Sequence, residues 1–138
     1  RALRLAEEVC RLFPGEGRAY AHRAYVKYFK GQYCESVEDC DRALRLQRDS
    51  WYFNIRGCCH VRMGKYYAAL DDFAEENLVR AQQELAAEDN LSIVFSNLGA
   101  DKIIQQALEE KTQQNFDKAE MYFKIVNHFD PKSQLPKS

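Results

Sequence analysis

The sequence has few of the residues that an all-β fold with many turns requires. It contains three prolines and six glycines in 138 residues, which leaves little material for the turns of a sandwich or barrel. No apolar run approaches the roughly 18 residues that cross a membrane as a helix, and no signal-like start is present. What remains, 46% hydrophobic and 30% charged residues, is the composition of a folded protein rather than a disordered one.

The five cysteines are an odd number, and they fall inside helical patterns rather than loops. Neither property is typical of a disulfide framework, so we expect a reducing, intracellular environment such as the cytoplasm. The chain opens at Arg1 within a predicted helix and without a Met. This opening indicates a piece of a longer protein.

Charge is divided unevenly along the chain, although the net charge is only −1. Residues 1–66 carry 13 Lys and Arg against 8 Asp and Glu, a net of +5, whereas residues 67–138 carry 7 against 13, a net of −6. The basic half is typical of a surface that attracts an acidic partner. A solvated helix face without any partner has the same composition, and the counts do not separate the two.

One ten-residue pattern occurs three times. It reads GQYCESVEDC at 31–40, GKYYAALDDF at 64–73 and QNFDKAEMYF at 114–123. Each copy begins with a turn residue, continues with an aromatic and a small residue, and ends on a large or sulfur-bearing apolar residue. The residues after the turn recur at steps of three and four, which predicts a helix, and a breaker-free segment of similar length precedes it. Each unit is therefore predicted to be a helical hairpin, and neighbouring hairpins must stack to bury their faces.

This pattern resembles the tetratricopeptide repeat (TPR), a 34-residue helical hairpin with an aromatic, Leu-Gly, Tyr, Ala-x3-Phe and closing Pro. The matching places are Phe53, Arg56-Gly57, His60 and Ala69-x3-Phe73 in the middle unit; Tyr20, Arg23-Ala24, Lys27 and Ser36-x3-Cys40 in the unit before it; Ala119-x3-Phe123 and Pro131 in the last; and Ala2-x3-Ala6 and Pro14 in an opening half-unit. The resemblance implies an all-α fold, a right-handed superhelical stack of antiparallel helix pairs in a single domain.

The expected boundaries follow from the three copies. Residues 1–16 are the second helix of a truncated repeat. Three repeats follow at 17–49, 50–77 and 100–133. Residues 78–99 are an extended helix and insertion between the second and third repeats, and 134–138 are a tail. Within the insertion, the pattern predicts that the preceding helix continues to about Asp89-Asn90. The apolar segment 91–99 suits a helix or a strand, and a helical stack favours the helix. Its Ile93, Val94 and Phe95 either cover the groove and dock a partner, or complete the core.

Candidates for catalysis or metal binding are few. Cys58, Cys59 and His60 are consecutive, so on a helix they point about 100° apart and cannot share one metal. His22, His60 and His128 lie in different units without a spaced carboxylate, and the pair Asp71-Asp72 is expected on a solvated face. There is no phosphate-binding loop. We therefore expect no enzyme activity, no cofactor and no metal.

The expected function is that of a scaffold that binds another protein. By the resemblance, the first helix of every unit lines a concave groove suited to an extended peptide or a partner helix. The residues at those places are Arg18, His22, Tyr25, Phe29, Trp51, Asn54, Ile55, Cys58 and Arg62. The segment AYAHRAY also resembles co-chaperone TPR domains that clamp a C-terminal carboxylate, but those have Asn at the place of His22 and a basic residue at that of Ile55. These departures favour another peptide of acidic or mixed character.

The alternative function is RNA binding. Five aromatics, from Tyr20 to Tyr33, alternate with Arg18, Arg23, Lys27 and Lys30, and stacking plus phosphate neutralisation uses such residues. Aromatics at helical steps more often pack between repeats, and the near-neutral charge argues against a nucleic-acid partner. A membrane partner is not expected. The open ends of a helical stack expose apolar faces, which predicts that self-association can occur there.

Overall fold

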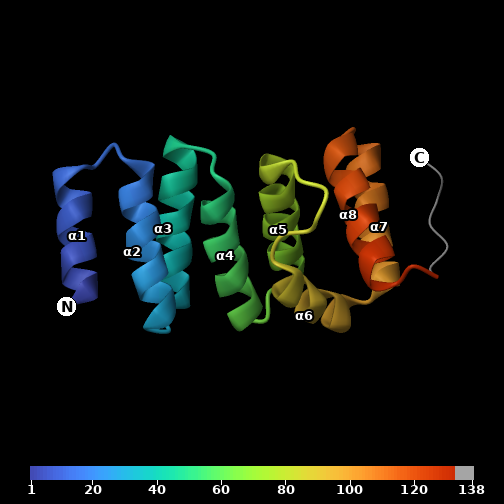
Figure 1. Ribbon diagram of the computed structural model, residues 1–138, viewed down its shortest axis with the longest axis horizontal. Helices are drawn as coiled ribbons and strands as arrows, with labels where there is room; N and C mark the ends of the chain where they lie inside the picture. The colour runs from blue at the N-terminus through green and yellow to red at the C-terminus, as the bar shows by residue number, and fades with distance from the viewer. Residues whose placement is uncertain (133–138) are drawn as a thin grey trace.

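The computed structural model describes residues 1–132, and this part of the chain is a row of eight helices without any strand (Figure 1). The prediction of an all-α fold is confirmed; the expected tail 134–138 lies outside the described residues. None of the described helices is long and apolar enough to cross a membrane. The helices are α1 (Ala2–Leu12), α2 (Gly17–Phe29), α3 (Tyr33–Leu46), α4 (Ser50–Arg62), α5 (Tyr66–Arg80), α6 (Glu88–Leu98), α7 (Ala100–Thr112) and α8 (Phe116–Phe129).

Helices α2 and α3, α4 and α5, and α7 and α8 form three antiparallel pairs, each joined by the same tight turn. The residue that opens each copy of the repeated pattern adopts a left-handed conformation, with φ of 79° at Gly31, 73° at Gly64 and 65° at Gln114. In all three turns the next amide donates to the carbonyl five residues earlier, for example from Gln32 N to Lys27 O at 2.9 Å. This is a Schellman cap, and it explains why two of the three copies start with glycine.

Within each pair the small residue of the pattern is buried, namely Ser36, Ala69 and Ala119. The Ser36 hydroxyl donates to the Ala24 carbonyl at 2.6 Å, and Ala69, the equivalent residue one repeat later, is fully buried. The neighbouring apolar residues differ in size between the pairs. The first pair has Ala24 and Cys40 at the places where the second pair has Gly57 and Phe73. A Cβ on Gly57 would lie 2.6 Å from the ring of Phe73.

This close approach predicts that Gly57→Ala destabilises the protein. In an exposed helix the change would gain about 1 kcal/mol of helix propensity, but overpacking a rigid core costs about 1–3 kcal/mol. We expect a net loss of about 1 kcal/mol in the free energy of unfolding by urea. In a Phe73→Leu background, where the ring is gone, Gly57→Ala should be neutral or stabilising. A loss of equal size in both backgrounds would show that Phe73 is not the obstacle.

Buried ion pairs connect the helices of the first two pairs, and they repeat at an interval of 33 residues. Arg23 binds Asp39 through two nitrogens at 2.9 and 2.7 Å, and Lys27 Nζ lies 2.9 Å from the same carboxylate. One repeat later, Arg56 and His60 bind Asp72 at 2.8 and 2.7 Å.

The prediction that Asp71 and Asp72 both lie on a solvated face is therefore wrong for Asp72. The prediction that His60 has no carboxylate partner is also wrong. Asp72 is 1% exposed, and its cations come from the other helix of the hairpin. His128 also has a carboxylate partner, Glu88, at 3.1 Å. In each case the two residues are distant in sequence and are brought together by helix packing.

The prediction that the helix α5 continues to about Asp89-Asn90 is wrong, and α5 ends at Arg80. Ala81 follows in a left-handed conformation with φ of 53°. The buried Asn77 side chain then fixes the connecting loop, since its Oδ1 accepts from Ala86 N at 2.7 Å and its Nδ2 lies 3.3 Å from Ala86 O. The predicted helix in 91–99 is confirmed as α6, in which Leu91 and Val94 belong to the core and Ile93 is 41% exposed.

Helix α6 changes how the last pair joins the stack. It runs across the lower edge of the row in Figure 1 and packs against both α4 and α5, as α4 packs against α2 and α3. The pair that follows then docks on α5 through its second helix, α8, whereas α7 makes no such contact. Two cores result, one among α1–α4 and one among α4–α8. The regular helix order of the first two pairs therefore ends at α5.

Candidate interaction surface on helices α2 and α4

Helices α2 and α4 lie side by side and present the predicted groove residues on adjoining faces. Arg18, His22, Tyr25 and Phe29 follow one another at steps of three or four along α2, and Trp51, Asn54, Cys58 and Arg62 do so along α4. Such steps place side chains on one face of a helix. Because the two helices are equivalent members of successive pairs, Arg18 lies at one end of the surface and Arg62 at the other.

The middle of this surface is an aromatic cluster shared by both helices. The Trp51 ring centroid lies 5.0 Å from that of His22 and 5.6 Å from that of Tyr25. Tyr25 in turn meets Phe29 edge-on at 4.7 Å. Despite these contacts Tyr25 remains 42% and Phe29 68% exposed, so the cluster offers apolar area to a ligand.

The two arginines at its ends differ in how they are held. Arg62 Nε donates to the Tyr28 hydroxyl at 3.2 Å, and this hydrogen bond, with the nearby phenol, raises the pKa of Arg62. Arg18 is exposed and lines a cavity of about 380 Å³ beside Val9 and His22. Both guanidinium groups face solvent, where they can donate to a carboxylate.

The prediction that Ile55 lines the groove is wrong, because Ile55 is buried. Its side chain is only 3% exposed and belongs to the core among α1–α4. The resemblance to TPR domains placed Ile55 in the groove together with Asn54, but consecutive residues on an α-helix point about 100° apart. Asn54 stays at the surface edge and Ile55 points inward.

Asn54, one turn after Trp51 on α4, is hydrogen-bonded to a buried carboxylate. Its Nδ2 lies 3.1 and 3.3 Å from the two oxygens of Glu76, which is 5% exposed. Burial raises the pKa of Glu76, and the Asn54 hydrogen bond only partly opposes this. Cys58 and Asn90 of α6 continue the same polar edge, with Asn90 Nδ2 lying 3.4 Å from Cys58 Sγ.

Glu76 makes a pH-dependent prediction. A carboxyl group whose folded-state pKa is raised adds stability that is fully present below its ordinary value of 4.5 and is lost as pH rises through the folded value. At pH 7 the buried charge therefore costs stability, and Glu76→Gln, which keeps an acceptor for Asn54, should unfold at higher urea concentration than the native chain. The difference should vanish as pH falls below 4.5. An advantage for Gln that persists there would contradict this explanation.

The thiols of Cys40, Cys58 and Cys59 are poorly suited to a reactive centre. Burial raises the pKa of the Cys58 thiol to about 11 and also raises those of Cys40 and Cys59. A thiol with a raised pKa is a poor nucleophile and metal ligand at neutral pH. Within residues 1–132, no three His, Cys, Asp or Glu side chains are grouped so that they could hold a metal ion.

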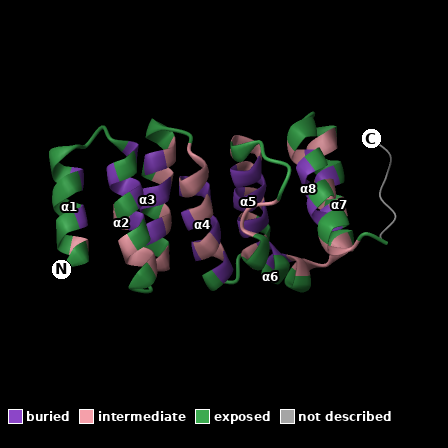
Figure 2. Ribbon diagram, viewed as in Figure 1, coloured by how far each residue is buried: buried purple, intermediate pink, exposed green. Residues whose placement is uncertain are grey.

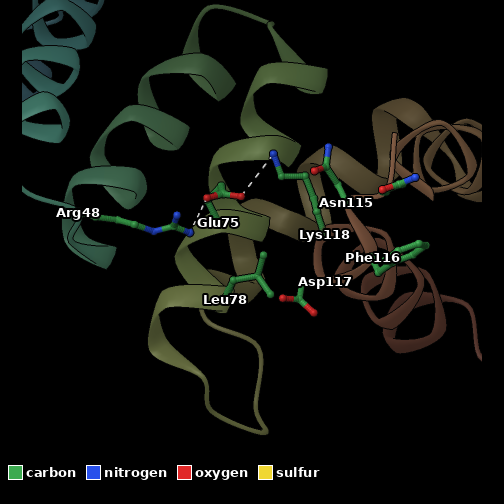
Figure 3. A pocket seen from close by; sticks show the side chains of 8 residues that line it. Arg48, Glu75, Leu78, Asn115, Phe116, Asp117 and Lys118 are labelled. Carbon is green, nitrogen blue, oxygen red and sulfur yellow. Dashed lines mark hydrogen bonds and ion pairs between the residues drawn. The ribbon is translucent and has the colours of Figure 1, made fainter. Parts of the chain in front are cut away.

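A separate cavity of about 400 Å³ lies between α5 and the start of α8 (Figure 3). Glu75 stands at its centre and bridges Arg48 at 2.6 Å and Lys118 at 3.3 Å. Lys118 also binds Asp71, and these carboxylates raise its pKa against the opposing effect of its burial. Of the charged residues that line this cavity, Arg48, Glu75 and Lys118 are therefore already paired within the protein.

Sequence reasoning missed Tyr28, Glu76 and Asn90 as neighbours of the surface. Tyr28 was part of the aromatic run, but its contact to Arg62 depends on the packing of α2 against α4. Glu76 and Asn90 carry no local signal, because each reaches the surface from another helix. No protein-family model matches the chain, and no curated protein matches it either.

Proposed function

We propose that this chain is a TPR-like protein-interaction module that binds a peptide segment on the surface of α2 and α4. The observation that carries the proposal is the aromatic cluster of His22, Tyr25, Phe29 and Trp51, which stays partly open although it is shared by two helices. Aromatic side chains and arginine dominate the energetics of protein interfaces. Here both occur on one surface, with an arginine at each end.

The repeat identity is part of this proposal. Pairs α2–α3 and α4–α5 share the turn, the small residue and the buried ion pair at an interval of 33 residues. We propose that they form two TPR-like repeats with right-handed superhelical stacking. Helix α6 then takes the place of the next first helix, so that the surface ends at its Asn90.

The partner that fits best is an extended or helical segment with an apolar anchor and acidic flanks. The anchor would cover Tyr25 and Phe29, and carboxylates would meet Arg18 and Arg62. RNA fits less well because several of its expected contacts are occupied within the protein. Arg23 and Lys27 bind Asp39, and Tyr20 is buried with its hydroxyl donating to Pro14 O.

Selection from a randomised peptide library displayed on phage tests the proposal. We expect enriched peptides to combine acidic residues with an aromatic or aliphatic residue. In fluorescence anisotropy, the double variant Arg18→Ala and Arg62→Ala should weaken the best peptide at least about tenfold, since interfacial arginines are often worth about 2 kcal/mol. Both residues are exposed, so helix content should not change.

The matched control is Arg45→Ala with Lys102→Ala, two exposed cations on α3 and α7. It should leave the affinity unchanged. Equal losses in both double variants would indicate a non-specific charge effect and contradict the site. Tighter binding to a single-stranded RNA oligomer than to any selected peptide would favour the alternative function.

A further inference from the structure

The connection between α5 and α6 is a loop, although every residue in it is a strong helix former. Residues 81–87 read AQQELAA, and Ala, Gln, Glu and Leu are among the residues with the highest helix propensity. Neither glycine nor proline occurs between Lys65 and Gly99. The local sequence therefore favours one continuous helix from Tyr66 to Leu98. Conflicts of this kind between local preference and fold are expected at functional or strained sites.

Both ends of this loop carry backbone strain. Ala81 and Ala87 adopt left-handed conformations with φ of 53° and 59°, in which the Cβ of an L-residue comes too close to the following carbonyl oxygen. At the turns that end α2 and α4, the chain has Gly31 and Gly64 in such positions instead. Straightening the loop into a helix would release the strain at both alanines.

The loop is fixed mainly at Ala86. The buried Asn77 side chain bonds the backbone N–H of Ala86 at 2.7 Å and lies 3.3 Å from its carbonyl oxygen, whereas a continuous helix would pair both groups with backbone four residues away. Leu85 and Ala87 pack at the edge of the core. The first half of the loop is exposed (Figure 2), and a cavity of about 540 Å³ lies between the loop and α8. Straightening would therefore break few contacts of the loop itself.

The helices on either side of the loop share one core, and exposing it to water would be costly. Phe73 of α5, Leu91 of α6 and Ile125 of α8 are fully buried in this core, and Lys118 Nζ of α8 lies 2.6 Å from Asp71 Oδ1 of α5. A straight helix from the start of α5 to the end of α6 would be about 50 Å long and would carry α6, α7 and α8 away from their own α5. A second copy that opens in the same way exposes the same two faces, and each face fits the other copy as it fits its own chain.

We propose that this chain forms a dimer with a second copy by exchanging α6, α7 and α8, with α5 and α6 joined as one continuous helix in each copy. Exchange of an identical element reproduces the contacts of the monomer and is a low-cost route to a dimer. Asn90 of α6, which lies 3.4 Å from Cys58 at the end of the surface of α2 and α4, then comes from the other copy. The exchange does not depend on any ligand of that surface.

Refolding of the full chain from urea at high and at low protein concentration tests the exchange, since unfolding frees both copies to recombine. Light scattering on a size-exclusion column should give a dimer after refolding at high concentration and a monomer at low concentration. Ala81→Gly with Ala87→Gly should reduce the ratio of dimer to monomer at least about tenfold, because glycine relieves the loop and weakens the helix. The matched control, Ala68→Gly with Ala100→Gly, places glycine in helices that both forms share and should leave the ratio unchanged.

A pair of charge variants distinguishes exchange from any other dimer. Asp71→Lys and Lys118→Asp each place like charges at the contact between α5 and α8, both in the monomer and in an exchanged dimer of one variant. When the two variants are refolded together, exchange brings the introduced lysine opposite the introduced aspartate, and the native Lys118 opposite the native Asp71. Native mass spectrometry should then show the mixed dimer above its statistical fraction.

Asn77→Ala removes the side chain that holds Ala86 in the loop, so it should raise the ratio of dimer to monomer. Monomers alone at every concentration, in this variant as in the native chain, would overturn the proposal. So would a ratio that the two glycines at Ala81 and Ala87 reduce no more than the control pair does. Mixed dimers at the statistical fraction would also overturn it, because the copies would then associate through another face.

Discussion

Arg56→Met should destabilise the protein by about 3 kcal/mol or more, because it leaves the carboxylate of Asp72 buried without its main cation. Asp72 is 1% exposed, and Arg56 contacts it at 2.8 Å. Only His60 would remain beside it, at 2.7 Å. Burial opposes the charge of Arg56, but hydrogen bonds to Asp72 and Asp41 more than compensate and raise its pKa. The free energy of unfolding from urea titrations at neutral pH measures this loss.

Two comparisons make the result specific. Arg48→Met also removes an arginine from an ion pair, with Glu75, but Arg48 is 59% exposed, and such pairs contribute about 1 kcal/mol or less. Adding Asp72→Leu to Arg56→Met should recover a large part of the loss, since an apolar pair of similar volume often replaces a buried ion pair at little cost. Equal losses for Arg56→Met and Arg48→Met would show that Asp72 is not isolated from water.

Ala69→Arg should cost on the order of 3 kcal/mol or more and should unfold a large fraction of the chain at physiological temperature. Ala69 is fully buried on α5, at the place where Ser36 touches the backbone of the partner helix in the first pair. A long charged side chain there must either separate α4 from α5 or lie unpaired in the core.

Ala68→Arg is the matched control, because it adds the same side chain one residue earlier at a partly exposed position. Its effect on the melting temperature should be much smaller. A shift of only a degree or two for Ala69→Arg, or equal shifts for both variants, would show that Ala69 does not lie at the closest approach of α4 and α5.

Most of the helical layout was predictable because it depends on local chemistry. Gly31 and Gly64 supply the left-handed caps that end α2 and α4, and apolar residues at three- and four-residue steps define the faces between them. The same periodicity places Arg18, Tyr25 and Phe29 on one face of α2. Ile55 and the solvated Asp72 were mispredicted, because burial depends on which helix packs opposite.

The insertion shows the limit of local signals most clearly. Residues 78–90 contain good helix formers, which favour one continuous helix. The structure ends that helix at Arg80 because the Asn77 side chain bonds both backbone groups of Ala86 and stabilises a loop instead. A contact between a side chain and a residue nine places away has no periodic signature.

The sequence by itself therefore determined the three helical hairpins and the turns within them, since these depend on residues close together in the chain. Only the tertiary structure decided that α8 rather than α7 packs on α5, that Asp39 and Asp72 are buried under cations from another helix, and that Trp51 meets His22. These contacts depend on how complementary faces of whole helices fit together, and that fit is settled by packing among residues far apart in sequence.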